Sequence, residues 1–291
     1  MVLAGVKQAW QPLRTQWLGQ RVLLAFEDRT LHGTALRKGS ISTAAWHSML
    51  PAQALQSGMP EQVDALGDFL GDLLLSMGLA GQPLRIAVPP EAAHWRVIRW
   101  PLDEWPDDPI EALRTIDPDL GLPFELADAA IDLQPLPGQP LRSLLVAAPR
   151  ALVEAWVSVL YIAGAPLERL LPTQVCLGAA LQQPLQQLDP RDGVLLLLPS
   201  VNGCCLVQLW QQGIPLYERR LDSQHPQFSQ QLATLVAYYG TRDSSFALRH
   251  VWLGGLLEQQ EQLTAALGLP VEQPDFAPYA SPVLKGLALL Q

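Results

Sequence analysis

The sequence predicts an α/β protein of two similar lobes, and three observations lead to this prediction. The chain has 291 residues, a length that suits one large two-lobed domain or two ordinary domains. Hydrophobic residues make up 49% and charged residues 16% of the chain, which supplies a sizeable core and is unlike a disordered protein. The predicted elements also repeat, because each half opens on a meander of three strands that a helix and a further strand follow.

The first half begins with two short apolar runs separated by a polar break of hairpin length. A third strand follows Lys38-Gly39. Apolar residues then recur at spacings of three and four from Val63 to Met77, which predicts an amphipathic helix that ends at Gly78. The predicted elements are strands at 23–26, 31–36 and 40–45, a helix at 61–77, and strands at 84–89 and 95–100.

A proline-rich stretch after residue 100 predicts an inserted subdomain. Trp95, Trp100 and Trp105 surround its start, and we expect them to pack the join between the first lobe and the insertion. The prolines are Pro101, Pro106, Pro109, Pro118 and Pro123. The expected elements are a helix at 110–116, an extended segment at 130–134, a strand at 144–148, and helices at 151–163 and 174–185.

A second meander starts after the turn-forming residues 189–193, and glycine-containing turns join its strands. The expected elements are strands at 194–198, 204–210 and 214–221, a helix at 227–239, a strand at 250–253, and helices at 256–267 and about 285–290. We assign residues 1–100 and 167–190 to the first lobe, 101–166 to the insertion and 191–291 to the second lobe. Whether the terminal helix returns to the first lobe stays open.

Composition argues against several classes of function. The net charge is −9, and no Lys/Arg cluster is suited to a phosphate backbone, so nucleic acid is not an expected partner. The three cysteines form no CxxC pair, which argues against a disulfide framework and structural zinc. No signal peptide is recognised, and apolar runs such as 194–198 are far shorter than the roughly 20 residues that span a bilayer. We expect a soluble cytoplasmic protein without a membrane span.

No constellation of residues predicts catalysis or a metal site. The five histidines share no spacing suited to a metal or to a catalytic base. The acidic run at 117–125 lacks the spacing of a calcium loop. Asp107-Asp108 and Glu111 form an acidic surface that suits either a helix cap or a basic peptide, and the cap is the simpler interpretation.

The repeated order of elements is that of the actin, sugar kinase and Hsp70 fold, a duplicated ribonuclease H-like architecture. Within it, residues 116–125 (IDPDLGLPFE) resemble a segment of the type IV pilus assembly protein PilM family, in which an acidic helix precedes a Pro-Phe sequence. Further similarities follow in the family's order at Asp132, 144–148, 163–167, 251–255, 267–271, Asp275 and 286–289. Each is short, and their order over residues 20–290 carries the resemblance.

The resemblance implies an actin-like fold with a small insertion in the first lobe and an ATP site between the lobes. PilM-type proteins also hold the cytoplasmic tail of the inner-membrane protein PilN in a surface groove, and they link the pilus alignment complex to its motor ATPases. For this chain it implies a PilN-like partner and a location at the inner membrane through that partner. We expect the tail between the insertion and the core of the first lobe, at Leu122, Pro123, Phe124, Leu145 and Val146.

The nucleotide motifs depart from the pattern of this superfamily. Its first phosphate hairpin resembles Asp-x-Gly-(Ser/Thr), in which the acid positions a metal and the glycine lets backbone N–H groups approach phosphate. Here Ala25 replaces the acid and Glu27 replaces the glycine, which places a negative charge where a triphosphate binds. The second hairpin, LPSVNG at 198–203, contains no carboxylate. The remaining candidates for a degenerate cleft are Asp28, Thr30, Asn202, Gly203, Gly254 and Gly255, with Mg-ATP as a cofactor left open.

We therefore predict a PilM-like scaffold that binds a partner's tail and does not hydrolyse ATP, because metal-dependent phosphoryl transfer requires the missing acids. Two alternatives stay open. One is a functional ATP-binding ATPase of the superfamily that uses the candidate residues of the cleft. The other is the cytoplasmic actin-like component of a type II secretion system, although such proteins usually continue into a transmembrane helix that is not seen in this sequence.

Overall fold

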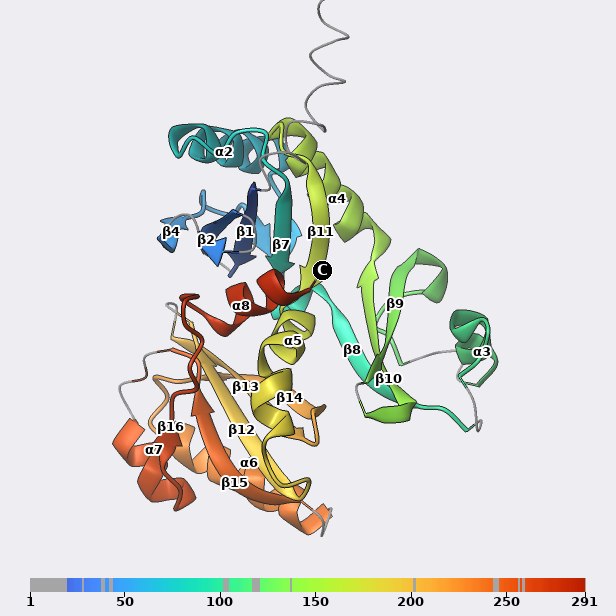
Figure 1. Ribbon diagram of the computed structural model, residues 1–291, viewed down its shortest axis with the longest axis vertical. Helices are drawn as coiled ribbons and strands as arrows, with labels where there is room; N and C mark the ends of the chain where they lie inside the picture. Colours follow the sequence, from blue (N-terminus) through green and yellow to red (C-terminus); the bar gives the residue numbers. More distant parts are fainter. Residues whose placement is uncertain are drawn as a thin grey trace, which may run out of the picture.

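The computed structural model shows two large sheets, a smaller sheet and a two-stranded ribbon, with helices packed around them (Figure 1). In Figure 1 one large sheet lies in the upper part, the other in the lower part, and the small sheet stands to one side. The structure describes residues 20–27, 29–37, 40–41, 44–101, 105–116, 121–136, 138–200, 203–242, 246–255, 257 and 260–290.

The upper sheet contains β1 (Gln20–Phe26), β2 (Thr30–Arg37), β3 (Ser40–Ile41), β4 (Trp46–Met49), β7 (Leu84–Val88) and β11 (Leu167–Pro172). Its order is β11-β7-β1-β2-β3, and β4 also pairs with β2. β1 is antiparallel to β2, whereas β7 and β11 run parallel to it. One half of the sheet therefore opens with the β1–β2 hairpin, and the other half is built from the parallel strands β7 and β11.

The third strand of this meander is not the single run at 40–45 that the sequence predicted. β3 ends at Ile41, residues 42–43 lie outside the described part, and β4 begins at Trp46. Trp46 pairs with Gly33 of β2, and its ring occupies the space that a Cβ of Gly33 would take. Two elements were not predicted, namely β11 and the ribbon of β5 (Leu55–Gln56) and β6 (Met59–Pro60).

Alternating residues of β1 pack on both faces of the upper sheet. The helices involved are α2 (Val63–Ser76), α4 (Arg150–Ile162), α5 (Thr173–Gln186) and α8 (Pro282–Leu289). Val22, Leu24 and Phe26 join a core with α2 and α4. Leu23 and Ala25 pack on the opposite face with α5 and α8. The sheet is thus covered on both sides, as a mixed sheet with parallel strands requires.

The lower sheet repeats the topology of the upper one. It contains β12 (Asp192–Pro199), β13 (Cys204–Gln211), β14 (Ile214–Asp222), β15 (Ala247–Leu253) and β16 (Val271–Glu272) in the order β14-β13-β12-β15-β16. The first three strands are antiparallel and the last two are parallel, as in the upper sheet. α6 (Phe228–Arg242) and α7 (Gln260–Leu267) cover one face, and α5 covers the other. This repetition confirms the predicted duplicated α/β fold, and α5 lies between the two sheets.

The smaller sheet has the order β8-β10-β9 and carries its own core. Its elements are β8 (His94–Arg99), β9 (Ala129–Leu136), β10 (Gln139–Pro149) and α3 (Pro109–Ile116). Trp100 and Trp105 pack edge to face at 5.4 Å, and the Trp100 indole donates to the Ser143 hydroxyl at 3.1 Å. These two rings fill the inside of this unit rather than its join to the first lobe. Trp95 lies on the other face, in a cluster with Ile214 of the second lobe.

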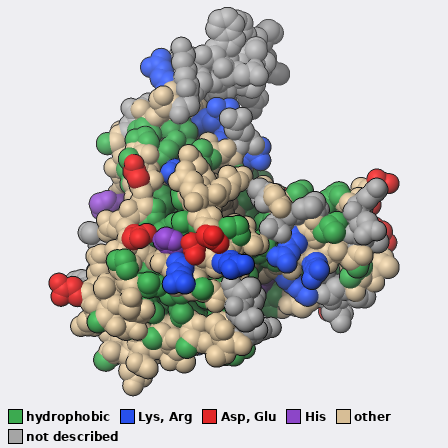
Figure 2. Space-filling model, turned by 60° about the horizontal axis from the view of Figure 1, so that its bottom comes forward, with side chains coloured by type: hydrophobic (Ala, Val, Ile, Leu, Met, Phe, Trp, Pro, Cys, Tyr) green, Lys and Arg blue, Asp and Glu red, His purple; other side chains and the backbone are tan. Residues whose placement is uncertain are grey.

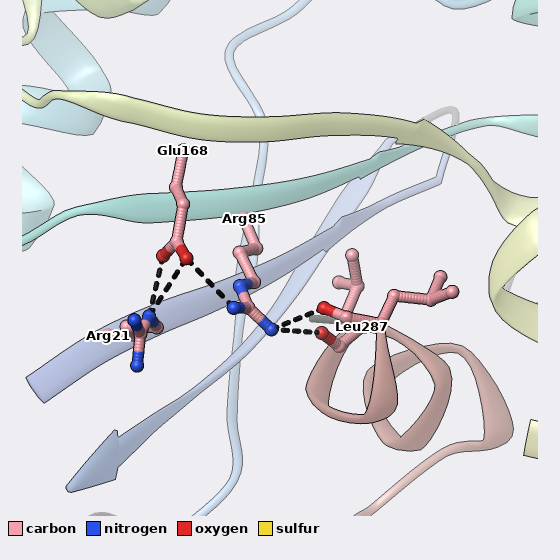
Figure 3. A network of polar contacts seen from close by, with 5 residues as sticks. Arg21, Arg85, Glu168 and Leu287 are labelled. Atoms are coloured by element: carbon pink, nitrogen blue, oxygen red, sulfur yellow. Dashed lines mark hydrogen bonds and ion pairs between the residues drawn. The ribbon is translucent and has the colours of Figure 1, made fainter. Parts of the chain in front are cut away.

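The terminal helix α8 is fastened to the upper sheet by the buried Arg85, which Figure 3 shows. Arg85 donates to the carbonyl oxygens of Leu287 at 3.2 Å and Leu290 at 2.6 Å, and to the Glu168 carboxylate at 2.8 Å. Arg21 donates to the same carboxylate at 2.7 Å. Burial alone would raise the pKa of Glu168, but the hydrogen bonds and charges of the two arginines outweigh it and lower this pKa. The C-terminal carbonyls of α8 are thereby satisfied by a side chain.

Candidate functional site

A cavity of about 90 Å³ lies between the two lobes, where the first hairpins of the two sheets meet. Its volume is well below the roughly 300–1,000 Å³ of small-molecule sites. Residues from both lobes line it, among them Phe26, Glu27, His32, Ser200, Arg220 and Gly254. The location corresponds to the interlobe cleft that the sequence predicted, but the space is small.

Glu27 connects the two hairpins. The Ser200 hydroxyl, from the second lobe, donates to the Glu27 carboxylate at 2.8 Å. The buried Thr30 hydroxyl donates to the same oxygen at 3.3 Å, and His32 Nε2 lies 3.6 Å from the other oxygen. A carboxylate of the chain thus occupies the point between the hairpins and collects hydroxyl donors from both lobes.

A second contact between the lobes is an ion pair. Arg220 of β14 pairs with Glu91, which follows Pro89-Pro90 at the end of β7. The side chains are 30% and 22% exposed, so the pair is only partly screened by water. Sequence reasoning did not identify it, because nothing in the local pattern of either residue indicates its partner.

The turn at Gly254-Gly255 is covered by the second hairpin. A Cβ on Gly254 would overlap the Leu198 side chain. A Cβ on Gly255 would lie 3.5 Å from the Cδ atom of Pro199. Gly254 therefore makes room for Leu198, whereas a side chain at Gly255 would make only ordinary contact with Pro199.

A polar cluster behind the cleft is centred on Glu218 of β14. Gln174 of α5 donates to this carboxylate at 2.9 Å, Gln208 of β13 donates at 2.5 Å, and Trp95 of β8 also hydrogen-bonds it. Burial raises the pKa of Glu218, although these hydrogen bonds act in the opposite direction. Gln174 donates as well to the Pro90 carbonyl at 2.9 Å, so the cluster joins both lobes and the small sheet.

Of the predicted cleft residues that the structure describes, one lines this cavity and a second contacts a lining residue. Thr30 supports Glu27, and Gly254 lines the cavity. Gly203, with a φ of +84°, accepts hydrogen bonds from the backbone and hydroxyl of Ser223. Asp28 and Asn202 lie outside the described residues. Sequence reasoning missed Ser200 as a contact and missed the Glu91–Arg220 pair.

The predicted partner residues do not form one surface, and Leu145 was the wrong choice. Leu145 has no exposed area and belongs to the core of the insertion, because successive residues of a strand point to opposite faces. Val146 faces the second lobe instead. Leu122 packs on the insertion core, and Phe124 lies edge to face with His94 at 5.6 Å. Leu122, Pro123 and Phe124 thus remain the predicted contact region.

Within the described ranges, no group of three or more His, Cys, Asp or Glu side chains is arranged to hold a metal ion. Asp108 accepts a hydrogen bond from the backbone of Glu111 at 3.0 Å, as a helix cap does. Among the helices of the described residues, none has the length and apolar character needed to cross a membrane.

No protein-family model and no curated protein matches the sequence, but solved structures match the fold. A chain of the PilM-PilN type IV pilus biogenesis complex aligns with 92% of this chain and 97% of its own length, at a TM-score of 0.72 and 17% identity. A Bacteroides thetaiotaomicron protein with an actin-like ATPase fold and unknown function covers 95% and 98%, at a TM-score of 0.58 and 9% identity. The chain has the actin-like fold.

A third solved structure of similar fold is the cytoplasmic domain of EpsL, an inner-membrane component of the type II secretion system of Vibrio cholerae. It aligns over 94% of this chain and 95% of its own length, at a TM-score of 0.54 and 11% identity. The resemblance expected from short motifs is therefore confirmed as a likeness of fold over nearly the whole chain.

Proposed function

We propose that this chain is a PilM-like scaffold of a type IV pilus or a related secretion machine. It acts in the cytoplasm beside the inner membrane, where it binds the tail of a PilN-like membrane protein and presents a surface to motor ATPases. The likeness to a PilM-PilN complex over 92% of the chain supports this proposal. The insertion at 101–166 supplies the tail-binding region, at Leu122, Pro123 and Phe124.

The observation that carries the scaffold role is the hydrogen bond at 2.8 Å from Ser200 to Glu27. A nucleotide triphosphate is strongly anionic, and a carboxylate between the two hairpins repels it. The chain thus fills its own cleft with a group that a nucleotide would have to displace. We infer that the protein neither needs nor hydrolyses ATP.

Titration calorimetry with Mg-ATP tests the inference that the protein does not need or hydrolyse ATP. We expect no heat at millimolar nucleotide and no phosphate release. Binding in the micromolar range that Gly255→Trp abolishes would contradict the proposal and favour the alternative of a working ATPase, because Gly255 lines the turn beside Pro199.

The tail-binding part is tested with a synthetic peptide of the cytoplasmic tail of a PilN-like protein from the same genome. We expect Phe124→Ala to weaken binding at least tenfold, since the half-buried Phe124 ring, which lies edge to face with His94, keeps area to offer a partner. Tyr161→Ala on α4 is the matched control, because its ring is 87% exposed and distant in sequence. Equal affinities of wild type and Phe124→Ala would remove Phe124 from the site.

The similarity to the EpsL domain favours a second candidate, a component of a type II secretion system. The EpsL domain has a TM-score of 0.54, against 0.72 for the chain of the PilM-PilN complex, so this candidate has less support than the pilus assignment. Binding of a type II secretion motor ATPase, with no binding of a PilN-like tail, would favour it.

A further inference from the structure

A groove of about 700 Å³ runs between the small sheet and the second lobe. It lies between β8 of the small sheet and β14 of the lower sheet. Half-buried apolar side chains form its floor, namely Trp95, Val97, Leu216 and Tyr217. A surface of this kind accepts apolar side chains from a partner.

Both strands that border the groove are edge strands. Within the described residues β8 pairs with β10 alone, and β14 pairs with β13 alone. The facing edges therefore present backbone N–H and C=O groups outside any ladder. An extended peptide is the partner that such an edge accepts, because it can continue the sheet.

Arg142 lines the groove and lies beside a second arginine of the small sheet. Arg142 of β10 stands directly opposite Arg99 of β8 in the register of the small sheet, and like charges in that position destabilise a sheet. Neither arginine makes an ion pair with any residue that the structure describes. Arg96 lines the groove as well. Figure 2 shows Lys and Arg side chains gathered where the insertion meets the main body.

The lining contains one carboxylate among the described residues, that of Glu218. Glu218 is engaged by Gln174 and Gln208. The chain as a whole carries a net charge of −9, so a concentration of arginines is not a consequence of its composition. Arginine recognises carboxylates through paired N–H donors.

We propose that this groove binds an extended, acidic segment of a partner protein. Carboxylates of the segment pair with Arg99 and Arg142, and its apolar residues pack on Trp95 and Tyr217. This surface adjoins the region proposed for the PilN-like tail, because His94 lines the groove and also lies edge to face with Phe124. The arginine variants of the groove and the Phe124→Ala variant test the two assignments separately.

A fluorescein-labelled peptide of twelve alternating Glu and Val residues is the probe, with binding to the full chain followed by fluorescence anisotropy at low salt. We expect saturable binding, at least a tenfold loss in Arg142→Glu, and a similar loss in Arg99→Glu. The matched control is Arg249→Glu, which makes the same charge change at an exposed arginine of β15 and should alter affinity less than twofold. A Lys-Val peptide of the same length should not bind.

Three outcomes would overturn the proposal. Unchanged affinity in both groove variants would show that the peptide binds elsewhere, and an equal loss in Arg249→Glu would reduce the effect to overall charge. Equally tight binding of a single-stranded DNA dodecamer would make the groove a general polyanion site.

The groove variants are expected to stay folded. Removing one of two facing arginines relieves repulsion, so we expect the variants to melt no lower than wild type. Arg142→Gln provides the same binding test with a smaller change.

Discussion

At the scale of single residues, Glu27 links the hairpins of the two lobes across the cleft. In the phosphate hairpin that the sequence resembles, a glycine leaves the backbone open to phosphate oxygens. Here the side chain at that position supplies carboxylate oxygens of its own, and Ser200 and Thr30 donate to one of them. The hydroxyl donors Ser200 and Thr30 already donate to Glu27. A phosphate that entered the cleft would therefore have to compete with Glu27 for them.

The carboxyl of Glu218 gives a prediction of pH dependence. Burial raises the pKa of Glu218 in the folded protein above its ordinary value of 4.5. The folded state therefore keeps a proton that the unfolded chain has released, so the stability from this group is fully present below pH 4.5 and is lost as the pH rises through the folded pKa. We expect the free energy of unfolding of wild type, measured with urea and taken relative to Glu218→Gln, to decline as the pH rises above 4.5. A difference that is flat or rises with pH would contradict this.

At the scale of elements, the crossing of α5 and α8 depends on one glycine. A Cβ on Gly286 would overlap the backbone carbonyl of Cys176, which is rigid helix rather than a movable side chain. We expect Gly286→Ala to lower the free energy of unfolding by about 1–3 kcal/mol, as overpacking does. Gly240→Ala in α6 is the matched control, because nothing lies within 4 Å of its added Cβ, and it should stabilise by about 0.5–1 kcal/mol. Urea titrations of both variants decide the comparison, and equal effects would contradict it.

The same elements show what a sequence can and cannot predict. Buried apolar runs made β12 and β13 predictable, whereas β11 was missed because Glu168 and Arg169 interrupt its apolar pattern. Glu168 is charged because its carboxylate accepts hydrogen bonds from Arg85 and Arg21. Leu145 was mistaken for a surface residue because the β10 pattern does not show which face the insertion buries. The long-range pair of Glu91 and Arg220 has no local signal at all.

At the scale of the whole molecule, both lobes are joined by shared elements and by side chains. α5 contributes to the cores on the facing sides of both large sheets, and α8 packs on the upper sheet through Leu284 and Leu287. Glu27–Ser200 and Glu91–Arg220 then bridge the cleft. These contacts hold the lobes in one relative orientation, so a partner meets a fixed surface. Such an arrangement suits a scaffold better than an enzyme whose lobes must open for nucleotide exchange.

The two bridges across the cleft are expected to act together, because both oppose the same opening of the lobes. We expect Glu91→Gln and Arg220→Gln to show a coupling of about 1 kcal/mol in a double-mutant cycle, which is the upper range for a partly exposed ion pair. Adding Ser200→Ala to Arg220→Gln should speed hydrogen exchange at residues 25–32 and 198–204 more than the sum of the single variants does. Arg249→Gln, an exposed change in the second lobe, should leave exchange in both segments as in wild type. If the two changes prove additive, the bridges are independent local contacts, and the lobes are held by α5 and α8 alone.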